Sequence, residues 1–452
     1  MNKLYIVVRL TAAVVLCLGL QVTKGVSQEA SERTHQYAGE TTSTKCIPDE
    51  VRQQIKRQIA INRRALIKSG KLKPAASRQP PMFIWPLQQA QGFDDPGYYA
   101  ISNYLDQDPT SGTLDYNCGT RTYNGHNGTD VRIVPFRWNK MANDEVEIIA
   151  AAAGTIILKQ DGNFDMSCAW GSGIPWNAVF VEHADGTVTW YGHMKNGSTT
   201  PKDSGDVVAA GEYLGIVGSS GNSTGAHLHF EVYDPLGNLV DPFQGPCNSL
   251  NNDTWWLNQL PYYDSGINRL ITATQQWTSP PCPQQAQIFE QDVFDAGEQI
   301  VFSVHYRHDL NTDSTQVRAV EPDGDVSTIL DLTYQRAGAF HSTNPAALWT
   351  RNIPANPEIG KWTFEADYYT TTYGLLSYEQ EFWVTGDCAV NYIFLFPHTV
   401  DRYYEASNTI SSTATIVGDT HIVYDAENVT TLSPGFHAPQ GCKLEIKTNG
   451  CQ

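Results

Sequence analysis

Residues 227–233 read His-Leu-His-Phe-Glu-Val-Tyr, and this stretch decides how the central part of the chain folds. Successive side chains of a β-strand point to opposite faces of a sheet. His227, His229 and Glu231 therefore share one face, while the apolar residues between and after them share the other. The stretch predicts a strand that carries two imidazoles on one side and packs against an apolar layer on the other.

Short segments of similar character surround this strand. The pair Asp185-Gly186 separates two of them and is a strong signal for a β-hairpin. Glycine-containing turns separate the others. The predicted strands cover residues 146–149, 155–159, 178–182, 187–191, 213–217 and 227–233. Together they predict a compact antiparallel β domain over residues 82–263.

Two further histidines of this region stand in distinctive contexts. His126 lies in Gly-His-Asn-Gly-Thr-Asp, and His193 lies in Tyr-Gly-His-Met. The spacing His126-x-x-x-Asp130 can bring an imidazole and a carboxylate together across a turn, and both are zinc ligands. With His229 they would make three protein ligands, which leaves a fourth position for a water whose pKa zinc lowers to about 7. His193 and His227 then remain for proton transfer or for stabilising an oxyanion.

Residues 115–243 resemble the lysostaphin-type zinc endopeptidases, also called the LytM-like or β-lytic family. His126 and Asp130 match the family's zinc motif, and the His-x-His signature implies that His229 is the third ligand of one catalytic zinc ion. The upstream catalytic histidine matches His193. A tyrosine that stabilises the transition state in the family has no clear match here, and Tyr123 is only a nearby candidate.

The resemblance implies a zinc metalloendopeptidase, a hydrolase that cuts stem or cross-bridge peptides of cell-wall peptidoglycan. A protease that cuts glycine-rich proteins is an alternative, because both activities occur among similar enzymes. A wall-binding module that has lost its metal is disfavoured because all five site positions are filled. Similarity to lipoyl or biotinyl carriers is also weak, since no suitable lysine motif is present.

The rest of the chain predicts a mainly β, multidomain protein. Residues 28–81 contain a basic amphipathic helix over 48–73, which ends near Gly70 and is followed by a proline-containing linker. This segment is a possible propeptide. Residues 264–285 predict a connector, 286–387 an immunoglobulin-like β-sandwich, and 388–452 a small disulfide-stabilised β module.

The N-terminus predicts export. Lys3 and Arg9 accompany an apolar stretch, residues 10–20, that is too short to span a membrane, so residues 1–27 read as a cleaved signal peptide. The mature protein is expected to be secreted or periplasmic, at a bacterial cell envelope and without a membrane span. The net charge of −18 argues against nucleic acid as a partner. The sequence does not predict an oligomeric state.

Eight cysteines remain after Cys17 of the signal segment is removed, and an even number in an exported chain indicates disulfides. The connectivity cannot be read, although Cys118 with Cys168 is an attractive pair within one domain. Cys46 has two interpretations. Its thiolate could block the zinc of a latent precursor, but a disulfide is the favoured prediction.

Two other residues near the predicted site have competing interpretations. Glu231 shares the metal-facing side of its strand and either orients a ligand or faces solvent, the structural role being favoured. His183, in Val-Glu-His-Ala-Asp-Gly, is predicted to be a polar turn residue. A structural role is also predicted for the remaining histidines: His35, His305, His308, His341, His398, His421 and His437.

Overall fold

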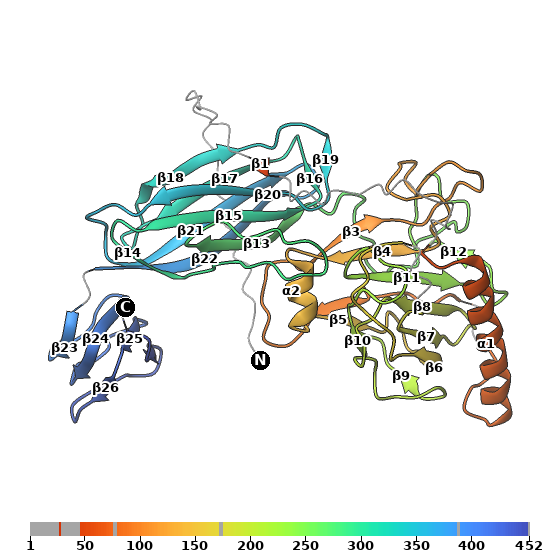
Figure 1. The fold of residues 1–452 in the computed structure, drawn as a ribbon, viewed down its shortest axis with the longest axis horizontal. Helices are drawn as coiled ribbons and strands as arrows, with labels where there is room; N and C mark the ends of the chain where they lie inside the picture. The colour runs from red at the N-terminus through yellow and green to blue at the C-terminus, as the bar shows by residue number, and fades with distance from the viewer. Residues whose placement is uncertain (1–26, 29–45, 76–78, 171–174, 387–388, 451–452) are drawn as a thin grey trace.

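The computed structural model describes residues 27–28, 46–75, 79–170, 175–386 and 389–450, and it confirms a mainly β protein (Figure 1). The predicted signal peptide, residues 1–27, lies outside the described residues except for its last residue. None of the described helices is long and apolar enough to cross a membrane.

An eight-stranded sheet forms the framework of the predicted peptidase region, in the order β3-β4-β11-β8-β7-β6-β9, with β12 paired to β11. Every described pairing in it is antiparallel. The strands are β3 (Tyr99–Asn103), β4 (Thr129–Ile133), β6 (Gly154–Gln160), β7 (Ala178–Glu182), β8 (Val188–Gly192), β9 (Val207–Val208), β11 (His227–Tyr233) and β12 (Leu239–Val240). The predicted strand 227–233 coincides with β11, which lies between β4 and β8. The register sets His229 opposite Asp130 of β4.

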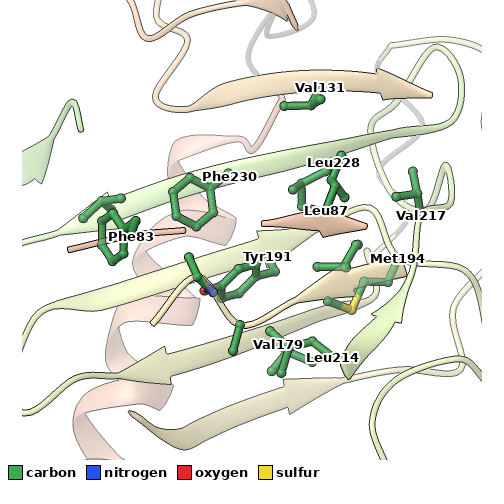
Figure 2. Close-up of a cluster of buried hydrophobic side chains, with 14 of the residues drawn as sticks. Phe83, Leu87, Val131, Val179, Tyr191, Met194, Leu214, Val217, Leu228 and Phe230 are labelled. Carbon is green, nitrogen blue, oxygen red and sulfur yellow. The ribbon is translucent and has the colours of Figure 1, made fainter. Parts of the chain in front are cut away.

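One face of this sheet carries the hydrophobic core. A three-stranded sheet of β10 (Tyr213–Ile216), β5 (Val146–Ile149) and β2 (Leu87–Gln89) belongs to the same core. Figure 2 shows Leu228 and Phe230 of β11 in this cluster with Val131, Tyr191 and Leu214. The alternation predicted for β11 is therefore confirmed, since its apolar residues enter the core while its histidines face the other way.

Helix α1 (Asp49–Lys68) covers part of the opposite face, as Figure 1 shows beside β6, β7 and β8. Its apolar positions Ile55, Ile59 and Leu66 are buried against that face. The structure confirms the helix predicted over 48–73, although it ends slightly earlier, with Ser69 as its C-cap. A second, short helix, α2 (Arg137–Ala142), follows β4.

Two further sheets pack face to face beyond the peptidase region. Their orders are β1-β20-β15-β13 and β14-β22-β21-β17-β18, and β16 pairs separately with β19. Phe302 and Phe382 meet in the core between them, at a centroid distance of 5.7 Å. The strands are β1 (Ser27–Gln28), β13 (Gly266–Ala273), β14 (Val293–Asp295), β15 (Gln299–Arg307), β16 (Asp309–Leu310), β17 (Ser314–Val320), β18 (Val326–Tyr334), β19 (His341–Ser342), β20 (Ala346–Asn352), β21 (Gly360–Thr370) and β22 (Gly374–Thr385). An immunoglobulin-like topology stays a prediction.

The predicted connector, residues 264–285, requires a correction. Strand β13 lies inside it and pairs with β15 along its whole length. Its burial pattern is almost continuous rather than alternating, because both faces of β13 are covered. The second part of the predicted connector contains no described strand.

The C-terminal part forms a small module in which every described strand pairing is parallel. It consists of β23 (Ala389–Phe394), β24 (Arg402–Ser412), β25 (His421–Ala426), β26 (Val429–Leu432) and β27 (Lys443–Lys447). Its predicted stabilisation by disulfides gains no support from Cys442, which is bonded to no described cysteine. Cys388 and Cys451 lie outside the described residues.

The described disulfides differ from the predicted pair of Cys118 with Cys168. Cys118 bonds Cys247, and Cys168 bonds Cys282. The second bridge ties the peptidase region to the segment between β13 and β14 of the sandwich. The prediction was wrong because both partners are more than 110 residues away along the chain, at separations of 129 and 114 residues.

The sandwich also contacts the outermost strand of the large sheet. The backbone N–H of Ile101 in β3 donates to Nε2 of His308, 3.1 Å away. Nearby, the side-chain amide of Asn268 donates to the carbonyl of Tyr99 at 3.1 Å. These bonds attach the sandwich to the strand that neighbours β4.

Candidate active site

The structure brings together three residues that the sequence predicts as metal ligands. Nε2 of His126 lies 3.1 Å from Oδ1 of Asp130, and Nδ1 of His229 lies 2.7 Å from the same oxygen. The two histidine nitrogens are 3.3 Å apart. All three side chains are buried. His126 lies in the loop before β4, while Asp130 and His229 face each other across β4 and β11.

Hydrogen bonds orient both histidine rings. Nδ1 of His126 lies 2.7 Å from the carbonyl oxygen of Tyr104, so this nitrogen donates and Nε2 is left to face Asp130. His229 is held the other way round, with Nε2 bound to Oε1 of Glu231 at 2.7 Å. Partners of this kind fix the tautomer and orientation of metal-binding histidines. Glu231 therefore points to a ligand of the site rather than to solvent.

The two carboxylates of the site are ionised despite their burial. Burial alone would raise the pKa of Asp130, but His126 and His227 hold that pKa well below its usual range. Burial likewise opposes ionisation of Glu231, and Arg52, followed by His229, holds the pKa of Glu231 well below its usual range. The site thus places negative charge where a cation would bind.

His193 and His227, the predicted catalytic residues, lie next to the three candidate ligands. Their ring centroids are 4.5 Å apart, and Nε2 of His227 lies 3.5 Å from Oδ1 of Asp130. Nδ1 of His193 bonds the carbonyl of Ser220 at 2.6 Å, and Nδ1 of His227 bonds that of Gly225 at 2.7 Å. Each imidazole consequently directs Nε2 away from its backbone partner.

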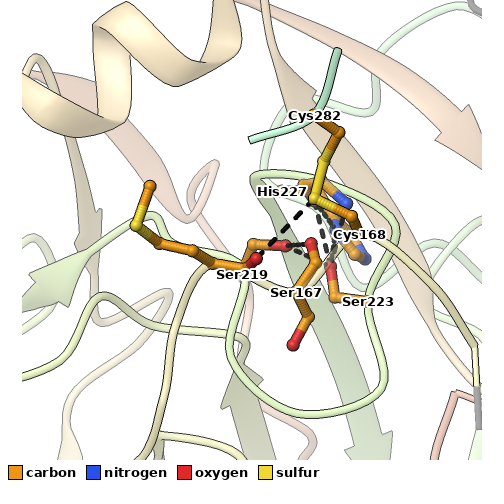
Figure 3. Close-up of a disulfide and its surroundings, with 8 residues drawn as sticks. Ser167, Cys168, Ser219, Ser223, His227 and Cys282 are labelled. Atoms are coloured by element: carbon orange, nitrogen blue, oxygen red, sulfur yellow. Dashed lines mark hydrogen bonds between the residues drawn. A yellow bond between two sulfur atoms is a disulfide. The ribbon is translucent and has the colours of Figure 1, made fainter. Parts of the chain in front are cut away.

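The disulfide between Cys168 and Cys282 lies at the edge of the site. Figure 3 shows it beside His227, next to a chain of hydroxyl groups. Ser223 Oγ lies 3.3 Å from Nδ1 of His227 and 2.8 Å from Oγ of Ser219. Ser219 Oγ also donates to the carbonyl of Ser167 at 2.7 Å, so the residue next to Cys168 is bonded to the loop that positions His227.

Two aromatic residues of the site were not assigned from the sequence. Tyr123 stacks on His126 at a centroid distance of 4.3 Å, and its buried hydroxyl has no hydrogen-bond partner among the described residues. Trp176 meets the ring of His193 edge-on at 5.5 Å. A Cβ at Gly192 would lie 2.0 Å from Trp176, so only glycine allows the indole to pack there. In the sequence, Gly192 directly before His193 was the feature that could have indicated a bulky side chain packed at this position.

Cys46 also lies at the site, which contradicts the favoured prediction of a disulfide. It is bonded to no described cysteine, and its Sγ is 3.0 Å from Nε2 of His193.

His183 lies away from this group and uses both ring nitrogens in hydrogen bonds, with the carbonyl of Ala153 and the hydroxyl of Thr189, each at 2.9 Å. The prediction of a structural role for His183 agrees with these bonds.

The donor set fits a metal ion of the zinc type. Two imidazole nitrogens and one carboxylate oxygen of His126, Asp130 and His229 lie within 4.8 Å of one another. Zinc takes these ligands in catalytic sites, where three protein groups leave a position for water or substrate. The three residues are therefore candidate ligands of a metal centre.

Residues 125–242 match the family model described as peptidase family M23. This segment is a metallopeptidase domain of that family, and the resemblance to lysostaphin-type enzymes is confirmed.

Among curated relatives, a segment of 56 residues is 47% identical to the DD-carboxypeptidase/endopeptidase Mpg of Neisseria meningitidis serogroup B, covering 12% of each chain. A segment of 92 residues is 36% identical to the cell division protein DipM of Caulobacter vibrioides, covering 20% of this chain and 14% of DipM. The similarity thus spans less than one sixth of either relative's length.

Similar solved structures include two catalytic domains. One is a variant of the prophage-encoded M23 protein EnpA from Enterococcus faecalis, at 24% identity, with a TM-score of 0.23, covering 34% of this chain and 94% of that one. The other is that of lysostaphin from Staphylococcus simulans, at 23% identity, with a TM-score of 0.20, covering 31% and 85%.

Proposed function

We propose that this protein is an exported, zinc-dependent endopeptidase that hydrolyses stem or cross-bridge peptides of peptidoglycan. The observation that carries the proposal is the convergence of His126, Asp130 and His229 on one buried point, with His193 and His227 beside it. The names of the relatives Mpg and DipM, an endopeptidase and a cell division protein, support a substrate in the cell envelope.

In this proposal, His126 Nε2, Asp130 Oδ1 and His229 Nδ1 hold one zinc ion. When bound, zinc supplies a Lewis acid and a nucleophile that is usable near neutral pH. His193 and His227 work through Nε2, because the backbone carbonyls of Ser220 and Gly225 occupy Nδ1. A neutral imidazole in that tautomer accepts a proton at Nε2 and afterwards donates it to the leaving amine.

The buried hydroxyl of Tyr123 supplies a third polar group. It has no partner among the described residues and lies over His126, so it is free to donate to the oxygen of a scissile carbonyl. A donor fixed before the reaction stabilises negative charge that develops on that oxygen. Tyr123 is therefore the proposed oxyanion donor, in the role that the sequence left unassigned.

Export to a secreted or periplasmic location is part of the same proposal. The chain contains two disulfides among its described residues, and such bonds persist in oxidising compartments. The N-terminal stretch with Lys3, Arg9 and an apolar run supports a signal peptide.

The test combines metal analysis with product analysis. Purified protein is expected to bind one zinc ion, and His126→Ala and Asp130→Ala are expected to abolish that binding. Because the sequence matches only part of its relatives, defined muropeptides and a glycine-rich protein should both be offered. They should be offered to the intact chain and to the chain after proteolysis in the exposed stretch 73–75, and the products identified by mass. Cleavage of muropeptide bonds supports the proposal. Cleavage of the glycine-rich protein alone, or no zinc uptake, would overturn it.

A further inference from the structure

The N-terminal segment, residues 46–72, lies across the face of the sheet that carries the candidate active site. The apolar side of α1 packs on buried aromatic residues of β7, β8 and β11. These contacts join Ile55, Ile59, Leu66 and Leu72 to a cluster that includes Phe180, Trp190 and Tyr233. The segment is thus packed as part of the domain.

Arg52 fixes the segment to the site by charge. Its Nη2 donates to Oε1 of Glu231 at 2.9 Å, and its Nη1 contacts the second carboxylate oxygen. The side chains of Arg52 and Glu231 are only 8% and 0% exposed. A buried charge is tolerated when it is paired in this way, and a carboxylate left without its partner is costly. The position of α1 is therefore specific rather than a loose contact.

Further polar bonds extend this attachment along the helix. Arg63 forms an ion pair with Glu182 at 2.7 Å, and the side-chain amide of Asn62 donates to the carbonyl of Ile157 at 2.8 Å. At the N-terminal end of the segment, Cys46 is buried. Its Sγ is placed among the histidines, since ligand atoms of Cys46, His193 and His229 lie within 4.8 Å of one another.

The covered site is closed to a peptide. His126 is 1% exposed, and His193 and His229 are both fully buried. The thiol of Cys46 lies among these groups, within 4.8 Å of nitrogens of His193 and His229, in the space that a scissile bond must enter. The segment must therefore leave before the enzyme works.

We propose that residues 46–72 form an inhibitory segment and that Cys46 is an additional ligand of the catalytic metal in the latent protein. This inference rests on the proposed zinc endopeptidase function. On binding the metal, the thiol releases its proton to solvent, and the sulfur takes the coordination position that water needs. Withdrawal of the segment would break the sulfur–metal bond, the thiolate would take up a proton from solvent, and water would occupy the freed position. No oxidation or reduction is involved.

The chain offers a place from which the segment can be released. Residues 73–75 directly follow Leu72 and are exposed, whereas Leu72 itself is buried with α1. Hydrolysis of a peptide bond in this exposed stretch would separate residues 46–72 from the domain that begins near Phe83. The remaining contacts of the helix then become intermolecular and are lost on dilution.

Cobalt(II) substitution of the full chain tests the sulfur ligand directly, because a thiolate bound to cobalt gives a near-ultraviolet charge-transfer band. The band is expected in the unaltered protein and in Cys442→Ser, but not in Cys46→Ser. Cobalt bound without the band would overturn this inference and leave the proposed metal site intact. Failure of the protein to bind cobalt would overturn the proposed function as well.

A matched pair of variants in α1 tests independently whether residues 46–72 shield the candidate active site. Ile59→Asp places a charge in the buried contact, whereas Ile61→Asp places it at a position that is 51% exposed on the same helix. Alkylation of Cys46, followed by mass spectrometry of its peptide in the zinc-loaded protein, is expected to be at least tenfold faster in Ile59→Asp than in Ile61→Asp. Equal rates in both variants and in the unaltered protein would overturn the inference.

Discussion

Glu231 accepts a hydrogen bond from Nε2 of His229 at 2.7 Å, while Arg52 of the N-terminal helix binds the same carboxylate. The first contact turns Nδ1 of His229 toward Asp130, and the second compensates the buried charge of Glu231. One carboxylate therefore joins the geometry of the candidate metal site to the docking of α1. Substitution of Glu231 should therefore affect both metal binding and the docking of α1.

Glu231→Gln is expected to weaken metal binding by roughly 10–100-fold, because it replaces the group that orients His229 by a weaker acceptor. The measurement is competition with a chelator of known affinity. Glu182→Gln is the matched control, since Glu182 pairs with Arg63 of the same helix but does not contact the candidate ligands. A similar loss of affinity in both variants would refute the orienting role.

Tyr123→Phe removes the one buried hydroxyl that we assign to the oxyanion. In the protein cleaved within residues 73–75 and freed of the inhibitory segment, we expect kcat to fall roughly 10²-fold, the usual effect of losing such a donor, with zinc content and KM little changed. Tyr213→Phe serves as the control, because the Tyr213 hydroxyl bonds the carbonyl of Ser198 outside the candidate site. Loss of zinc in Tyr123→Phe would point to a structural role instead.

Replacing Cys168 and Cys282 together by serine should reduce the free energy of unfolding by about 2–5 kcal/mol, as removal of a native disulfide commonly does. It should also reduce kcat, because the bridge supports the loop beside His227 (Figure 3). The corresponding double replacement of Cys118 and Cys247 is expected to affect stability only. Urea unfolding and steady-state kinetics separate the two effects. The expectation for His227 fails if both double variants retain full kcat.

His305, which lies away from the candidate site, is expected to make the stability of the folded protein depend on pH. Burial, together with Arg269 and Lys140, lowers the pKa of His305 from 6.5 to about 3. Between these values the unfolded chain binds a proton that the folded chain excludes, so stability falls as the pH drops below about 6.5. The slope for this group is at most about 1.4 kcal/mol per pH unit.

His305→Phe removes this titration and keeps an aromatic ring between Phe136 and Trp277. The stability of the variant relative to the unaltered protein should therefore rise as the pH is lowered from 7 to 4. Urea unfolding of the metal-free proteins at each pH measures the difference. A difference that stays constant with pH would show that His305 is not neutral in the folded protein.

The elements around the site could be predicted because their local patterns are strong. Along β11, polar and apolar residues alternate in the sequence between His227 and Val232, although the strand is buried on both faces. The buried position of Arg52 could also have been predicted from the sequence. It precedes Ile55 by three residues and Ile59 by seven, so it belongs to the buried face of a helix that was itself predicted.

Long-range pairing could not be predicted in the same way. Nothing in the spacing of Cys118 indicates a partner 129 residues away, because the path between them depends on the folded domain. The same reason explains Cys46, which lies 147 residues before His193 in sequence but 3.0 Å from it in space. Strand β13 was assigned to a connector because it is buried on both faces and so shows no alternation, and because Pro280, Pro281 and Pro283 follow it.

The bonds from His308 and Asn268 to β3 have a practical consequence for dissecting the protein. They occupy backbone groups on the open side of an edge strand, which would otherwise offer a template for pairing with another chain. A fragment that stops at residue 263 would uncover that side and is prone to self-association. Solubility of an isolated peptidase domain therefore depends on where its C-terminal boundary is drawn.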